Sequence, residues 1–303
     1  MAVASARFRP AAMIARLRDR PPVVPVIRLY GTIGRGGAFR GGLTLAGLAG
    51  VIQKAFAHKR APAVALAINS PGGSPVQSAL IARRIRDLSE EKKIPVLAFC
   101  EDVAASGGYW LATAADEIFV DDSTIVGSIG VIAAGFGFHE AIGRYGIERR
   151  VHTAGARKAI LDPFQPEDPE DVALLHDLQA DVHASFKAQV RGRRGDALKG
   201  DEAELFSGRF WTGRRAVELG LADGIGHLRP ILKERFGEKV RMRPMDTERG
   251  LLRRRFGLPL GRAGGAGPDA AAIESLATAI LRDGAGEVLA ALEERALWQR
   301  YGL

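Results

Sequence analysis

Two short runs, AVALAIN at residues 63–69 and PVLAFC at residues 95–100, constrain the fold most. Each is apolar on both faces, as a strand is when it lies in the middle of a parallel sheet that helices cover on both sides. A helical pattern at 76–93 separates them, and the alternation of strand-like and helix-like segments starts near residue 22 and recurs along the chain. Such alternation favours parallel strands joined by right-handed crossovers. The sequence therefore predicts an α/β fold with a mostly parallel sheet.

The same patterns divide the chain into three parts. We expect a core domain over residues 21–235, preceded by a basic N-terminal extension at 1–20. Beyond the core, residues 236–303 hold an arginine-rich run, a glycine-rich linker and a terminal helical pattern of alanine and leucine. We interpret this last part as a basic linker and a helical appendage.

Composition narrows the classes of function. The 303 residues carry a net charge of +8, with the basic excess concentrated at the two ends, so peripheral contact with an anionic membrane surface is one expectation. Aromatic residues make up 7% of the chain and do not alternate with basic ones, which argues against a nucleic-acid partner. No run reaches the roughly 18 apolar residues of a membrane-spanning helix. The single cysteine, Cys100, excludes an internal disulfide. We therefore expect a cytoplasmic chain whose membrane contact, if any, is at the inner face of the cytoplasmic membrane.

A glycine-rich turn follows each of the two buried strands, SPGG at 70–73 and EDVAASGG at 101–108. The carboxyl ends of parallel strands share the edge at which α/β sheets bind ligands, so the two turns should form one site. In that site the hydroxyl of Ser106 could attack a carbonyl while the N–H groups of Gly73 and Gly107 stabilise the oxyanion. Two structural interpretations stay open: Ser106 as a helix N-cap, and the first turn as an ordinary Pro-Gly turn capped by Asn69.

A serine nucleophile needs a base, and the sequence offers histidine or lysine. The six histidines stand at helix ends, on charged helical stretches or without supporting context: His58, His139, His152, His176, His183 and His227. Lys158 differs because it lies among small residues in TAGARKAILDPF, although a surface loop lysine has the same local signature. Burial favours the neutral amine that a base requires.

We expect no metal ion and no cofactor. The sequence holds no HExxH, CxxC or carboxylate cluster. The glycine-rich stretch at 34–42 lacks the last glycine of a dinucleotide-binding fingerprint, and no P-loop lysine follows it. We interpret that stretch as a surface or substrate-side loop.

Four motifs follow one another along the chain: NSPGG at 69–73, ASGGYW at 105–110, GSIGV at 127–131, and WTG at 211–213 with small residues up to 224. Together they resemble the signal peptide peptidase A family of serine peptidases, over about residues 24–230. The resemblance implies a crotonase-like, Clp-protease-related α/β fold of repeated ββα and βα units. It also implies a catalytic dyad of Ser106 as nucleophile and Lys158 as base, with Ser128 orienting the lysine and with Gly73 and Gly107 as oxyanion donors.

The resemblance further implies peptide substrates, small and unfolded or hydrophobic, such as signal-peptide remnants. It implies a homo-oligomer, a ring or dome in which neighbouring subunits can supply the two dyad residues. The family commonly carries a transmembrane anchor, for which this sequence shows no apolar run; an arginine-rich N-terminal helix on an anionic membrane could substitute for it.

Two other functions stay open. A crotonase-type acyl-CoA enzyme would use the same two backbone donors, with Glu101 or Asp102 as its acid/base. A non-catalytic assembly scaffold would use the C-terminal helix of alanine and leucine.

Overall fold

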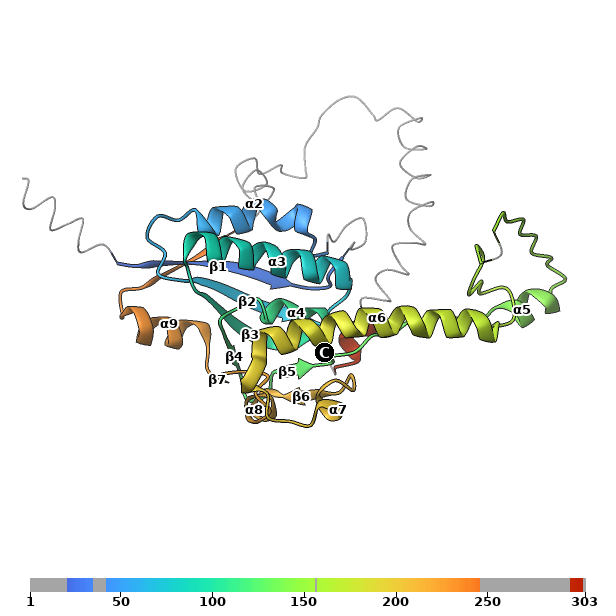
Figure 1. Ribbon diagram of the computed structural model, residues 1–303. Helices are drawn as coiled ribbons and strands as arrows, with labels where there is room; N and C mark the ends of the chain where they lie inside the picture. The colour runs from blue at the N-terminus through green and yellow to red at the C-terminus, as the bar shows by residue number, and fades with distance from the viewer. Residues whose placement is uncertain (1–20, 35–41, 156, 246–294, 302–303) are drawn as a thin grey trace, which may run out of the picture.

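The computed structural model describes residues 21–34, 42–155, 157–245 and 295–301 (Figure 1). The strands form one eight-stranded sheet in the order β6-β5-β3-β2-β1-β8, with β4 paired to β3 and β7 paired to β4. Every pair of strands is parallel except β5 and β6, which run antiparallel. The predicted fold class, α/β with a mostly parallel sheet, is confirmed.

Strands and helices alternate along the chain as the sequence predicts. The strands are β1 (Val23–Tyr30), β2 (Val64–Ser70), β3 (Val96–Ala105), β4 (Glu117–Val120), β5 (Ile125–Gly127), β6 (Phe210–Thr212), β7 (Gly224–Ile225) and β8 (Arg241–Met245). The helices are α2 (Leu45–Phe56), α3 (Pro75–Lys92), α4 (Gly107–Ala112), α5 (His139–Arg144), α6 (Pro169–Arg194), the 3-10 turn η1 (Gly195–Ala197), α7 (Glu202–Leu205), α8 (Gly213–Glu218) and α9 (Leu228–Phe236).

Both faces of the sheet are buried, because successive residues of a strand point to opposite sides. On β2, Leu66 and Ile68 pack in the cluster that includes residues of α2, α3 and α4, whereas Ala65 and Ala67 pack in the cluster that includes Leu232 of α9. Figure 1 shows α2 and α3 on one side of the sheet and α9 on the other. The two apolar runs are therefore central strands, and β2 and β3 deliver their carboxyl ends side by side.

The core sheet continues beyond residue 235, where the sequence analysis placed the end of the core domain. Strand β8 pairs with β1 along the edge of the sheet, from Arg241 beside Val23 to Met245 beside Ile27. Arginines alternate with apolar residues in this strand, as is common at an edge that must stay soluble. The same arginines lead the sequence analysis to place residues 236–303 in a basic linker and appendage. Residues 1–20 and most of the C-terminal appendage lie outside the described residues.

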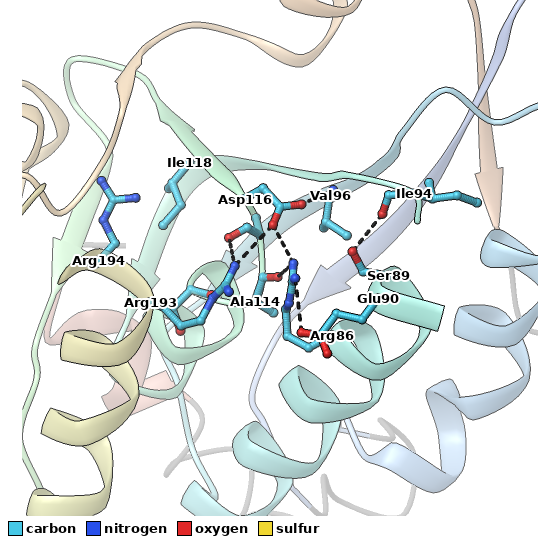
Figure 2. A network of polar contacts seen from close by, with 12 residues as sticks. Arg86, Ser89, Glu90, Ile94, Val96, Ala114, Asp116, Ile118, Arg193 and Arg194 are labelled. Atoms are coloured by element: carbon cyan, nitrogen blue, oxygen red, sulfur yellow. Dashed lines mark hydrogen bonds and ion pairs between the residues drawn. The ribbon is translucent and has the colours of Figure 1, made fainter. Parts of the chain in front are cut away.

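Two arginines around Asp116 join α3 and α6 to the segment between α4 and β4 (Figure 2). Arg86 donates to Asp116 Oδ1 at 2.7 Å, and Arg193 reaches the same oxygen at 3.4 Å while it also donates to two carbonyls at the end of α4. The other carboxylate oxygen accepts a hydrogen bond from the Val96 N–H at 2.8 Å. Burial and the neighbouring charge of Arg86 lower the pKa of Arg193. The network fixes α4, which begins directly after Ser106, against α3 and α6.

The segment at 131–168, which we call the arm, projects away from the sheet and carries α5 (Figure 1). No residue of α5 is buried. Among its described residues the arm exposes seven large apolar side chains, including Phe136 at 77% and Tyr145 at 82%; the others are Ile132, Phe138, Ile147, Val151 and Leu161. Apolar side chains gathered on an exposed segment are typical of a protein contact surface.

Within the described ranges, no helix combines the length and apolar character that crossing a bilayer requires. In the same ranges, no three His, Cys, Asp or Glu residues come together in a way that could hold a metal ion.

Candidate active site

Ser106 lies between β3 and α4 in a backbone conformation that residues with a side chain rarely adopt. Its φ is 53° and its ψ is −122°. Its N–H donates to the Gly127 carbonyl at 2.8 Å, and its own carbonyl accepts from the Trp110 N–H at 3.0 Å. Although Ser106 occupies the N-cap position of α4, its side chain makes no capping hydrogen bond. The N-cap interpretation is therefore wrong, and the hydroxyl is left for another role.

The glycine turn after β2 packs directly against Ser106, as the shared sheet edge predicts. A Cβ on Gly72 would lie 2.8 Å from the Ser106 Cβ and 2.9 Å from the Gly107 nitrogen, so only glycine allows this approach. Gly73 has a φ of 139°, and a Cβ there would collide with the Ile33 carbonyl oxygen. The glycines of SPGG thus bring the two turns into contact.

The N–H groups of Gly73 and Gly107 remain available beside Ser106. On either side of Gly73, the Gly72 N–H donates to Ser70 Oγ at 3.3 Å and the Ser74 N–H donates to a backbone carbonyl at 2.7 Å. Gly107 begins α4, where the first N–H groups have no acceptor within the helix. Among the described residues, no backbone acceptor engages either glycine. Two free donors next to a hydroxyl are what an oxyanion site requires.

Asn69 does not cap the first turn. Its side-chain nitrogen donates to Asp102 Oδ2 at 2.6 Å and its side-chain oxygen accepts from the Val103 N–H at 3.2 Å, which ties β2 to β3. The neighbouring carboxylate, Glu101, accepts a hydrogen bond from the Tyr30 hydroxyl at 2.7 Å. Burial, together with this carboxylate, raises the pKa of Tyr30 to about 12. Both carboxylates thus make contacts at an exposed part of β3.

Ser128 lies in a second strained turn next to Ser106. Its φ is 54° and it is 4% exposed. The Ser128 N–H donates to the Arg209 carbonyl at 2.7 Å, and the Ser128 carbonyl accepts from the Gly130 N–H at 2.9 Å. The ring of Trp211 packs so closely on Gly127 that a Cβ there would lie 2.7 Å from it. The WTG motif therefore supports the turn that carries Ser128.

Ser106, Ser128 and Gly73 line one cavity of about 590 Å³. The remaining lining comes from the two prolines around the first glycine turn, the start of the arm, α6, residues 207–208 and the C-terminal segment at 295–301. Gly107 lines a smaller adjoining cavity that also includes Ser106 and Gly73. Within the described part of the chain, His183 and Arg300 are the basic residues in the lining of the larger cavity, and no carboxylate takes part. The structure thus brings together four of the five predicted site residues.

Lys158, the fifth, does not lie at the cavity of its own chain. It is exposed and belongs to the arm, where its N–H donates to the Gly155 carbonyl at 3.2 Å. It does not belong to the lining of either cavity that contains Ser106. Figure 1 shows the arm directed away from the sheet.

His183 is a cavity residue that sequence reasoning set aside. It lies on α6, and its Nε2 is 3.0 Å from the Ile129 carbonyl oxygen, in the turn that carries Ser128. The sequence does contain a pattern that predicts its position. His183 stands three and seven residues before Phe186 and Val190, which are the buried apolar residues of α6. Residues spaced in this way share a helix face, so His183 had to face the core.

The family model for peptidase family S49 matches residues 89–239. A protein of Enterococcus faecium named putative signal peptide peptidase SppA is 32% identical over 191 residues, which is 62% of this chain and 54% of that protein. A solved structure of a membrane-bound stomatin-specific protease covers 75% of this chain and 99% of its own, with 18% identity and a TM-score of 0.47.

A protein of Brucella abortus named Na(+)/H(+) antiporter NhaA is 51% identical over 290 residues, or 95% of this chain. The chain spans only 38% of that protein. The name of the Brucella protein describes an ion transporter, whereas the matching family model and the Enterococcus relative are named as peptidases. The transporter name is given to that longer protein as a whole, and it is not carried over to this chain.

Proposed function

Because this chain belongs to peptidase family S49, we propose that it is a serine endopeptidase with Ser106 as nucleophile and Lys158 as base. One observation carries the proposal: Ser106 is held at a φ of 53°, its side chain caps no helix, and it lines a cavity with Gly73. A serine with a purely structural role would not need this conformation. Strained residues cluster at sites where the strain serves the chemistry.

The proposed reaction is acyl transfer to Ser106. Neutral Lys158 accepts the proton of Ser106 Oγ, and Oγ attacks the carbonyl carbon of the peptide bond. The N–H groups of Gly73 and Gly107 donate hydrogen bonds to the oxyanion. The ammonium then protonates the leaving amine, and water hydrolyses the acyl-enzyme by the reverse steps. Ser128, in the cavity wall, hydrogen-bonds the lysine and orients it.

This mechanism requires a homo-oligomer, a ring or dome in which the arm of one copy brings Lys158 to the Ser106 of another. The exposed apolar side chains of the arm support it, because burying a fully exposed side chain of this kind contributes at most about 1.5–3 kcal/mol. The same contact would surround the amine of Lys158 with protein and favour its neutral form. A lone copy would then have a nucleophile and oxyanion donors but no base.

The proposed substrates are small unfolded or hydrophobic peptides, of which signal-peptide remnants are one source. The cavity supports this choice. Pro71, Val131 and Ile132 give it an apolar lining, and its described lining contains no carboxylate that could bind a basic side chain of the substrate. We also propose a cytoplasmic location with peripheral contact at the inner face of the membrane, on the strength of the basic residues concentrated at both ends of the chain.

Two single variants and their mixture test the dyad. We expect Ser106→Ala and Lys158→Ala each to abolish cleavage of an unstructured fluorogenic peptide, with unchanged circular dichroism. If the two residues meet between copies, subunit exchange of the two inactive variants should restore about a quarter of the wild-type rate, because random assembly pairs an intact serine with an intact lysine at that frequency. Lys187→Ala, on α6 and absent from the cavity lining, is the matched lysine control. Full activity in either single variant would refute the proposed Ser106–Lys158 dyad.

The acyl-CoA enzyme and the scaffold have no observation in their favour. Glu101 and Asp102 are exposed and bonded to Tyr30 and Asn69, and neither is part of the lining of the Ser106 cavity. An idle scaffold would not need the strained conformations of Ser106 and Ser128.

A further inference from the structure

The C-terminal segment at 295–301 lies on the Ser106 cavity, although residues 246–294 separate it from β8. Leu297, Arg300 and Tyr301 belong to the same cavity lining as Ser106 and Ser128. In Figure 1 the segment, in red, lies beside β5. We call it the C-terminal cover.

Two aromatic side chains anchor the cover next to the nucleophile. Tyr301 is 9% exposed and packs in a cluster with Val103 and Ala105, the residue that precedes Ser106. Its ring meets that of Phe210 edge-on, with 5.3 Å between the centroids. Trp298, one turn earlier, packs against the same cluster. The anchors therefore hold the cover against β3 and β6, on the strands that position Ser106 and support Ser128.

Polar contacts add little to this attachment. Within the described residues, the hydrogen bonds of the cover are its own helical ones, from the Arg300 N–H to the Ala296 carbonyl and from the Tyr301 N–H to the Trp298 carbonyl. No ion pair between the cover and the described core is present. A segment held by two aromatic contacts can leave without breaking a buried polar network.

The size of the cavity indicates what the cover excludes. A volume of about 590 Å³ is that of a small-molecule pocket. An endopeptidase substrate must extend on both sides of the scissile bond, and an extended chain advances about 3.3 Å per residue. The cover occupies part of the surface around Ser106 that such a peptide would cross. It is a part of the cavity wall that no hydrogen bond or ion pair among the described residues ties to the sheet.

We propose that the C-terminal cover and peptide substrates compete for the surface around Ser106, so that substrate binds after Trp298 and Tyr301 have left it. This competition would regulate the proposed peptidase function, and the proposal therefore rests on that function. The uncovered surface would offer Val103, Ala105 and Phe210 to apolar side chains of the peptide.

The competition is measured in full-length chains that carry Ser106→Ala, so that the peptide is not cleaved while its binding is measured. The probe is a fluorescent, unstructured apolar peptide of about twelve residues, followed by anisotropy. Adding Tyr301→Ala should lower the apparent Kd up to roughly tenfold, since an aromatic pair is worth up to about that factor. Trp298→Ala should act in the same direction. Gln299→Ala, on the exposed side of the same segment, is the control and should change nothing.

Three results would overturn the proposal. Unchanged binding in both aromatic variants would mean that the cover does not compete. Weaker binding would make it a fixed wall of the substrate site, and absence of peptide binding in every variant would mean that removing the anchors exposes no peptide site. Failure of the peptidase function has a different signature: chains with Ser106 intact would not hydrolyse the peptide, whatever the binding data show.

Discussion

Replacing Ser106 by glycine should stabilise the protein while it destroys activity. A residue with a side chain in a sparsely populated backbone region, here φ 53° and ψ −122°, carries about 1–3 kcal/mol of strain. Glycine adopts that region freely but loses about 0.5–1 kcal/mol through the greater conformational freedom of its unfolded chain. We therefore expect Ser106→Gly to raise the free energy of unfolding by up to about 2.5 kcal/mol.

Ser106→Ala is the matched control, because it removes the same hydroxyl and keeps the Cβ that causes the strain. Both variants should lose peptide hydrolysis, and only the glycine variant should gain stability. Urea denaturation followed by circular dichroism measures the difference between the two. Both must be measured at one protein concentration, since association with other copies would add to apparent stability.

The reasoning fails if Ser106→Gly is no more stable than Ser106→Ala. The strained conformation would then not be maintained in the folded protein, or it would not cost the chain free energy. In either case the argument that Ser106 is held for chemistry would lose its support, even if both variants were inactive.

The ion pair of the buried Arg194 and the buried thiol of Cys100 give two further tests. Arg194, whose side chain is 6% exposed, donates two hydrogen bonds to Asp223 at 2.9 Å and one to the Gly220 carbonyl at 2.8 Å. Arg194→Met should lower the free energy of unfolding by about 1–3 kcal/mol, because the Gly220 carbonyl and the Asp223 carboxylate both lose the hydrogen bonds donated by the buried guanidinium; a change below about 0.5 kcal/mol in urea denaturation would contradict this. Burial raises the pKa of Cys100 to about 12, so the native thiol should not react with Ellman's reagent at pH 8 and should react fully in guanidinium. The raised pKa also makes the free energy of unfolding depend on pH: it should be constant with respect to this group below the ordinary thiol pKa of about 8.5 and should fall as the pH rises towards 12. Rapid reaction of the native protein with the reagent at pH 8 would contradict the burial of the thiol.

Local sequence patterns were sufficient to predict the part of the site that the sheet builds. Both apolar runs predict central strands, and the carboxyl ends of adjacent parallel strands meet, which brings Gly73 and Gly107 to one edge of the sheet. The choice between cap and nucleophile for Ser106 could not be made locally. It depends on whether the side chain accepts a helix N–H, and this is set by the contact with Gly72 from another strand.

Two features could not be predicted because their causes lie far away in the chain. Tyr301 reaches Phe210 through aromatic packing between segments with no shared pattern, and the alanine-leucine pattern around Tyr301 indicates a helix without indicating its partner. Strand β8 was missed because its arginines resemble those of a solvated tail, whereas an edge strand needs only one apolar face.

The placement of these parts separates stability from activity. Ser106, Ser128, Gly73 and Gly107 are held by backbone contacts at one edge of a sheet that is buried on both faces, so the fold itself maintains the nucleophile and its oxyanion donors. The arm with Lys158 and the C-terminal cover contribute few buried residues to that core. In the proposed enzyme, assembly supplies the base and peptide binding displaces the cover, and neither step requires the sheet to rearrange. Changes in the arm or the cover should therefore alter the rate of hydrolysis far more than the stability of the domain, which is the opposite of what changes at Arg194 should do.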